Sequence, residues 1–222
     1  AIASLVAYRP QAALDILSQP DHADEVDSIM WRTIAKTELG DYQGARLDAL
    51  AAEGILDAYP SWVQARFLLA SARAAIETND VATANQMLGN VDFAKLGPEE
   101  ISEFGLLQGR LAELGGQTDV ALEDYGQVIT ADIRPTRAEA VYRTILMLNE
   151  QGRIDLAAAT QTLAAESMLW RGNRLEADMS KLLAELYFRA GLYRDGFEVV
   201  QQAVAYYPEN ESIAELLDES QK

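Results

Sequence analysis

A short turn recurs at regular intervals along this chain, and apolar segments with helical spacing lie on either side of it. Successive anchors of the turn are 39, 37, 36 and 39 residues apart, at Gly40, Asn79, Gly116, Gly152 and Gly191. A small residue follows each anchor by five positions: Ala45, Ala84, Ala121, Ala157 and Gly196. A period this steady predicts a solenoid of helical hairpins, in which each hairpin buries its apolar face against its neighbours.

The last repeat shows the pattern most clearly. An apolar stripe with helical spacing runs along Met179, Leu182, Leu183, Leu186 and Tyr187. Gly191 then suits the left-handed backbone that ends a helix. Four earlier helix pairs are expected over residues 26–39 and 42–56, 65–78 and 81–91, 100–114 and 118–129, and 138–151 and 154–165.

A half unit at residues 9–19 and a short capping helix at 212–220 complete the expected array. A repeat array behaves as one continuous body, so we expect a single solenoid domain over residues 1–222. The first residues, 1–7, resemble the tail of a helix, and we therefore interpret the chain as part of a longer protein.

The residues at the helix crossings and turns resemble those of tetratricopeptide-repeat proteins. Small residues stand where the two helices of a unit would cross, at Thr33, Ala72, Gly109 and Ala184. The turns are of Gly-Asp-Tyr type, and two units end with a proline, at Pro60 and Pro208. The resemblance implies an all-α fold, a right-handed alpha-alpha superhelix of about five hairpins. It also implies a protein-interaction scaffold that binds a peptide or partner protein in a concave groove, without indicating which partner.

Composition narrows the classes of partner. The chain has 35 acidic and 18 basic residues and a formal net charge of −17, which disfavours nucleic acid and anionic membrane surfaces. Cysteine is absent, so disulfides, thiolate nucleophiles and cysteine-based zinc sites are excluded. No apolar run is long enough for a membrane span. The acidic, alanine-rich composition favours a bacterial source, and the periplasm over the cytoplasm.

Few residues suggest chemistry. His22 is the only histidine, in an acidic segment that lacks the glycine and ligand spacing of a calcium loop, and we interpret it as part of a solvated loop. Catalysis by a Ser-His-Asp or Cys-His group is close to excluded. We therefore expect no catalytic residue, metal or cofactor. Two alternatives remain open: a carbohydrate-active alpha-alpha enzyme with paired carboxylates, and an architectural module that associates through its repeat ends.

In tetratricopeptide-repeat proteins the first helix of each hairpin lines the groove, and this implies a set of candidate residues here. They are Met30, Ile34, Arg66, Leu69, Arg73, Leu106, Arg110, Tyr142, Leu146, Lys181 and Glu185. Arg66, Arg73 and Arg110 would form a basic strip, and our hypothesis is that it recognises a carboxylate or an acidic peptide. Leu69, Leu106 and Tyr142 would supply apolar contact.

A structural interpretation of the same arginines competes with this hypothesis. Glu77 follows Arg73 by four residues and Glu113 follows Arg110 by three, so both arginines are expected to form exposed ion pairs within their helices. Trp31 and Trp62 are expected to pack between neighbouring repeats, whereas Trp170 is either a contact for a partner or packed against the array.

Overall fold

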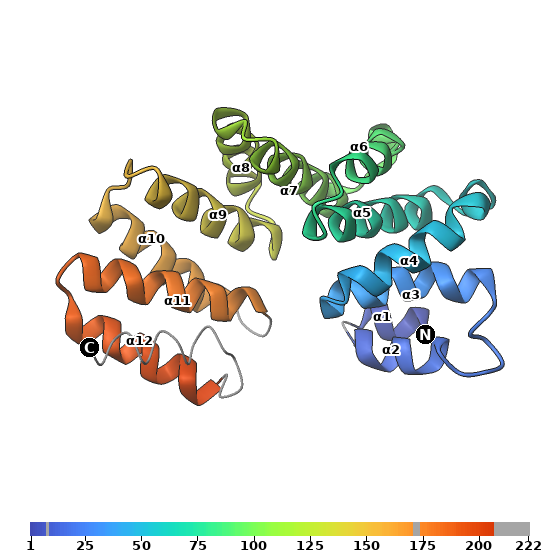
Figure 1. Ribbon diagram of the computed structural model, residues 1–222, viewed down its shortest axis with the longest axis horizontal. Coiled ribbons are helices and arrows are strands. Elements are labelled where there is room, and N and C mark those ends of the chain that lie inside the picture. Colours follow the sequence, from blue (N-terminus) through green and yellow to red (C-terminus); the bar gives the residue numbers. More distant parts are fainter. Residues whose placement is uncertain (8, 171–173, 207–222) are drawn as a thin grey trace. The chain divides into compact units, whose positions relative to one another are not determined.

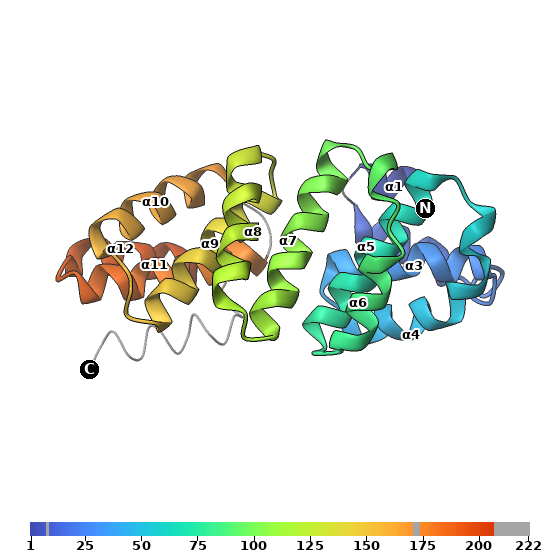
Figure 2. The same cartoon turned by 90° about the horizontal axis from the view of Figure 1, so that it is seen from above.

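The computed structural model describes residues 1–7, 9–170 and 174–206, and every regular element among them is a helix (Figure 1, Figure 2). The chain divides into two compact units, Ala1–Asp124 and Tyr125–Lys222, which are described separately. The elements are α1 (Ile2–Val6), α2 (Pro10–Leu17), α3 (Val26–Leu39), α4 (Tyr42–Ala52), η1 (Glu53–Ala58), α5 (Ser61–Glu77), α6 (Val81–Gly89), η2 (Phe93–Lys95), α7 (Pro98–Leu114), α8 (Thr118–Ala131), α9 (Thr136–Glu150), α10 (Leu156–Leu169), α11 (Arg174–Arg189) and α12 (Tyr193–Tyr206).

These elements form five consecutive hairpins, α3/α4 to α11/α12, preceded by α1 and α2. All ten predicted helix positions are confirmed, with small differences at their ends. The helix predicted over 42–56 ends as an α-helix at Ala52 and continues as the 3-10 helix η1. Helix α10 runs to Leu169, four residues beyond its predicted end at 165. The predicted capping helix at 212–220, and Pro208, lie outside the described residues.

One backbone geometry repeats at all five turns. Each anchor has a positive φ: 80° at Gly40, 57° at Asn79, 70° at Gly116, 66° at Gly152 and 75° at Gly191. The anchor N–H donates to the carbonyl three residues back, and the following N–H donates to the carbonyl five residues before it, as Gly40 does to Thr37 and Asp41 to Lys36. This is the Schellman ending of a helix, in which otherwise unpaired carbonyls are satisfied.

The fourth hairpin departs from the predicted register. In the other four, the second helix begins two residues after the anchor, and the small residue at the fifth position is buried. After Gly152, however, α10 begins four residues later, because Asp155 caps it by accepting hydrogen bonds from the N–H groups of Ala157 and Ala158. Ala157 is therefore exposed, and Ala159 is buried instead. The buried small residue of this hairpin therefore lies two positions later, relative to its anchor, than in the other four.

In the first unit, the first helices of successive hairpins pack side by side, α3 on α5 and α5 on α7. Helix α5 joins two hydrophobic clusters. Val63 and Phe67 pack with residues of α1 to α4, whereas Leu68, Leu69 and Ile76 pack with α6 and α7. Because each cluster draws on several helices, no single hairpin could bury its own apolar face.

The second unit has its own core. Helices α9, α10 and α11 enclose a cluster that includes Val141, Leu163, Met179 and Leu183. Helix α12 covers the far side of α11, where Val200 is buried against Ala184. The prediction of one domain over residues 1–222 stays a prediction.

Candidate functional site

Ion pairs connect the first helices of neighbouring hairpins in the first unit. Arg73 Nε of α5 lies 3.0 Å from Glu103 Oε1 of α7. Arg110 Nη1 of α7 lies 2.7 Å from Glu77 Oε1 of α5, and its Nε lies 3.8 Å from Glu113 Oε2. These contacts tie α5 to α7 at two levels. We call Arg73, Glu77, Glu103 and Arg110 the α5–α7 ion pairs.

The α5–α7 ion pairs change the interpretation of the predicted basic strip. The expected pairing of Arg110 with Glu113 is present but long, and the shorter contact of Arg110 is with Glu77 of the preceding hairpin. Arg66 lies on α5, seven residues before Arg73, and its charge acts on Glu38 of α3. Burial of the Glu38 carboxyl group raises the pKa of Glu38, and the Arg66 charge lowers it in part. Carboxylates therefore alternate with the arginines along these three helices.

The other predicted groove residues have varied positions. Met30, Ile34, Leu69 and Leu106 are core residues, at most 5% exposed, so their side chains pack inside the first unit. Tyr142, Leu146, Lys181 and Glu185 belong to the second unit and are half-buried. Tyr142 and Leu146 pack against that unit's core, and the Arg143 guanidinium lies 5.6 Å from the centre of the Tyr142 ring.

Two buried carboxylates with basic partners were missed by sequence reasoning. Asp48 of α4 accepts hydrogen bonds from Arg32 Nε and Nη2, both at 3.1 Å, and lies 2.7 Å from Lys36 Nζ. Asp48 shares the buried face of α4 with Ala45, Ala49 and Ala52, and an acidic residue within an apolar stripe was the signal that could have revealed it.

Glu166 of α10 is the second such carboxylate. It is 2% exposed and lies 3.0 Å from Arg137 Nε and 3.2 Å from Arg134 Nε. It also falls on an apolar stripe, after Ala159 and Leu163. Both groups fix helix packing, because a buried charge is tolerated only with such partners.

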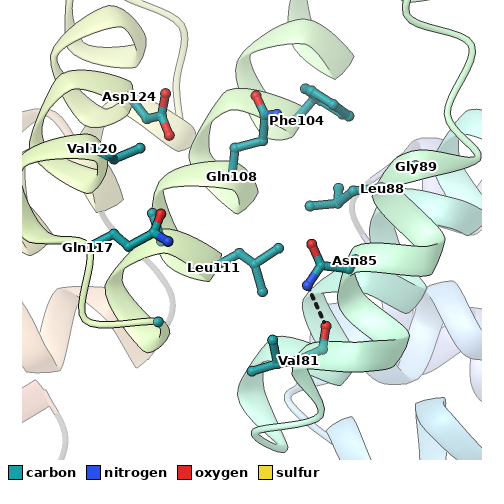
Figure 3. A pocket seen from close by; sticks show the side chains of 12 residues that line it. Val81, Asn85, Leu88, Gly89, Phe104, Gln108, Leu111, Gln117, Val120 and Asp124 are labelled. Carbon is teal, nitrogen blue, oxygen red and sulfur yellow. Dashed lines mark hydrogen bonds between the residues drawn. The ribbon is translucent and has the colours of Figure 1, made fainter.

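A groove of about 490 Å³ lies over α7, between α6 and the beginning of α8 (Figure 3). All of its lining residues belong to the first unit. They are Val81, Asn85, Leu88, Gly89, Phe104, Gln108, Leu111, Ala112, Gly115, Gln117, Val120 and Asp124. We call this space the α6–α8 groove.

The length of α6 accounts for the groove. Helix α6 has 9 residues and α7 has 17, so at 1.5 Å per residue α6 covers about half the length of its neighbour. The chain then passes through η2, where Phe93 packs edge-on against Phe104 with 5.5 Å between ring centres. The segment at 92–97 therefore contacts the groove wall from outside, because Phe104 is one of the lining residues.

The walls of the α6–α8 groove are apolar with a few polar groups. Val81 is 40% and Val120 48% exposed, and both face the space over α7 (Figure 3). Asn85, Gln108 and Gln117 contribute carboxamides, and Asp124 is the one charged residue in the lining. The pKa of Asp124 is raised by burial and by the neighbouring Glu123 charge.

Comparisons with known proteins identify the fold. No protein-family model matches the sequence. No curated protein matches it either. A solved structure, of a tetratricopeptide repeat protein from Parabacteroides merdae, is similar with a TM-score of 0.68, over 99% of this chain and 79% of the other, at 15% sequence identity. The chain has the tetratricopeptide-repeat fold.

The tetratricopeptide-repeat fold accounts for the five Schellman turns and the small crossing residues, and it confirms the resemblance inferred from them. At 15% identity the likeness concerns the fold alone. Proteins with this fold are generally scaffolds for protein interaction. The α6–α8 groove and the α5–α7 ion pairs, in contrast, are features of this chain's own residues.

The remaining candidates fit structural roles. His22 Nδ1 lies 3.2 Å from Glu25 Oε2 in an exposed segment. Within the described ranges no group of three or more His, Asp or Glu side chains is placed to hold a metal ion. The Trp31 and Trp62 rings pack with 6.1 Å between centres, across α3 and α5, although Trp62 stays 50% exposed. Trp170 packs against the core of the second unit.

None of the helices that the structure describes combines the length and the apolarity that crossing a bilayer requires.

Proposed function

We propose that this chain is a protein-binding module that holds a segment of a partner protein in the α6–α8 groove. The observation that carries the proposal is the pair of exposed valines, Val81 of α6 and Val120 of α8, which line the groove together with the apolar side chain of Leu111. Exposed apolar side chains that converge on a concave surface, with a few polar groups among them, are typical of binding sites.

The α5–α7 ion pairs favour this groove over the predicted basic strip. A partner carboxylate that binds Arg73 or Arg110 must first displace Glu103 or Glu77, and the Arg110 side chain is only 7% exposed. Separating these charges costs free energy that a new contact has to exceed. An acidic peptide on these helices is therefore a less favourable occupant than an apolar segment in the α6–α8 groove.

The alternative of a carbohydrate-active enzyme receives no comparable support. Glycoside hydrolysis usually needs two carboxyl groups that flank the bond to be cleaved. Asp124 is the one carboxylate among the residues that line the α6–α8 groove. A second acidic side chain that could act with it is not part of this lining.

Selection from a phage library of random dodecapeptides tests the proposal. We expect enriched peptides whose affinity falls at least tenfold when Val120 is changed to Asp, since a charge then replaces an apolar wall. Leu47→Asp is the matched control, because Leu47 is 68% exposed on α4 and lies outside the groove. Loss of affinity in both variants, or in neither, would place binding elsewhere and refute the proposal.

A further inference from the structure

The polar groups that line the α6–α8 groove indicate which kind of segment can bind there. Its twelve lining residues include no lysine, arginine or histidine, one carboxylate and three carboxamides. Asp124 therefore lies among apolar and neutral side chains, and Glu123, the charge nearest to it in sequence, repels it. A basic group brought by the partner would offset both effects.

The three carboxamides come from three different parts of the wall. Asn85 lies on α6, Gln108 on α7 and Gln117 in the turn before α8. Asn85 Nδ2 donates to the carbonyl of Val81 at 2.9 Å, which leaves its Oδ1 turned toward the groove (Figure 3). Gln108 and Gln117 are both exposed.

A carboxamide offers one acceptor and a pair of N–H donors, and this complements a peptide group of an extended chain. In a helical segment the main-chain N–H and carbonyl groups are hydrogen-bonded to one another, so they do not need carboxamide partners. The carboxamides thus favour an extended occupant, and the valines favour aliphatic side chains on it.

From this arrangement we infer that the α6–α8 groove takes an extended peptide segment with a lysine or arginine beside aliphatic residues, its basic group paired with Asp124. The inference rests on the proposed function and adds the chemistry of the partner. The formal net charge of −17 acts in the same direction, since it attracts a basic segment at long range.

The test uses two synthetic peptides and nuclear magnetic resonance of the isotope-labelled chain. The first is acetyl-Val-Leu-Lys-Leu-Val-amide, and the second has Glu in place of Lys. We expect the Lys peptide to shift the amide resonances of Asn85 and Gln108 and to bind about tenfold more tightly than the Glu peptide, because a charge-assisted hydrogen bond is lost in the latter.

Charge reversal at Asp124 separates a local contact from long-range attraction. Asp124→Lys should reverse the preference, so that the Glu peptide binds more tightly. Glu123→Lys changes the net charge equally from the adjacent position outside the lining, and it should keep the preference for Lys. Asp124→Asn, a smaller change, should remove most of the discrimination if the lysine variant fails to fold.

The outcomes distinguish this inference from the proposed function. Equal affinity for the two peptides, equal effects of the two charge reversals, or no shift in the groove at millimolar peptide would overturn the inference. Library peptides whose binding depends on Val120 would still support the groove as a binding site in each of those cases.

Discussion

Arg110 Nη1 on α7 donates a hydrogen bond to Glu77 Oε1 on α5 across 2.7 Å, and the arginine side chain is 7% exposed. The two residues are 33 positions apart and belong to successive hairpins. The pair therefore acts between repeats, where an array depends on contacts between neighbours for its stability. This ion pair gives Arg110 a structural role that does not depend on a ligand.

Arg110→Ala should lower the free energy of unfolding by about 1–3 kcal/mol, because the Glu77 carboxylate then loses its partner in a half-buried position. Glu77→Ala should cost a similar amount, and the double variant less than the sum of the two. Urea unfolding of the four proteins measures this coupling. Arg194→Ala, at an exposed position of α12, should change stability by no more than about 0.5 kcal/mol. Equal effects at Arg110 and Arg194 would contradict a structural role for the pair.

The sequence predicts the backbone of this protein better than its surface. The turns are predictable because the left-handed conformation strongly favours glycine and, after it, asparagine, and this preference leaves a visible period in the sequence. The register of α10 was not predictable from the period, because Asp155 offers a cap that begins the helix two residues later. Both capped and uncapped starts fit the same apolar pattern.

The candidate site was less predictable for a physical reason. Groove residues such as Leu69 and Leu106 were chosen by their position in a regular repeat, yet that position is buried when helices of the next repeat approach closely. The α6–α8 groove lies beside a nine-residue helix, α6, and the short 3-10 helix η2 that follows it, and both are departures from a regular repeat. A repeat pattern predicts only the features that the units have in common, whereas this groove lies where one hairpin has a short second helix.

Gly40→Ala should destabilise the protein by about 1–2 kcal/mol, because φ is 80° at this position and a Cβ disfavours that backbone. An added Cβ would meet no atom within 4 Å, so the cost is conformational. Gly40→Asn should cost less than Gly40→Ala, since Asn79 adopts the same conformation in the next turn. Thermal unfolding of the variants measures these effects, with Gly126→Ala as the control. Gly126 is in α8 with open space around it, so alanine there should stabilise the protein by about 0.5–1 kcal/mol. Gly40→Ala as stable as wild type would contradict the assignment.

Asp80 should make stability depend on pH at the acidic end. Its carboxylate caps α6 by accepting hydrogen bonds from the Thr83 N–H at 3.1 Å and hydroxyl at 2.9 Å. These bonds, with a smaller contribution from the Arg46 charge, hold the pKa of Asp80 below its usual value. The folded pKa is thus lower than the unfolded one, near 3.9, so the contribution is complete above about pH 4 and is lost as pH falls through the folded pKa.

Asp80→Asn isolates this effect, because asparagine still accepts hydrogen bonds at the cap and does not titrate. Urea unfolding of both proteins at several pH values between about 2 and 6 gives the difference in stability between them. We expect the advantage of the wild type to shrink as pH falls below about 4. A difference that stays constant across this range would show that the carboxylate charge does not contribute.

Gly196→Ala tests the close contact between the helices of the last hairpin. A Cβ at this position would lie 2.5 Å from Cε1 of the Phe188 ring, and that ring is held edge-on by Phe197 with 5.2 Å between centres. We expect a loss of about 1–3 kcal/mol in the free energy of unfolding, since the ring has to move within a packed interface. In a Phe188→Leu background the same substitution should cost less or stabilise the protein, because the clash is gone and alanine favours a helix over glycine. Equal costs in the two backgrounds, measured by urea unfolding, would show that the size of residue 196 is not set by Phe188.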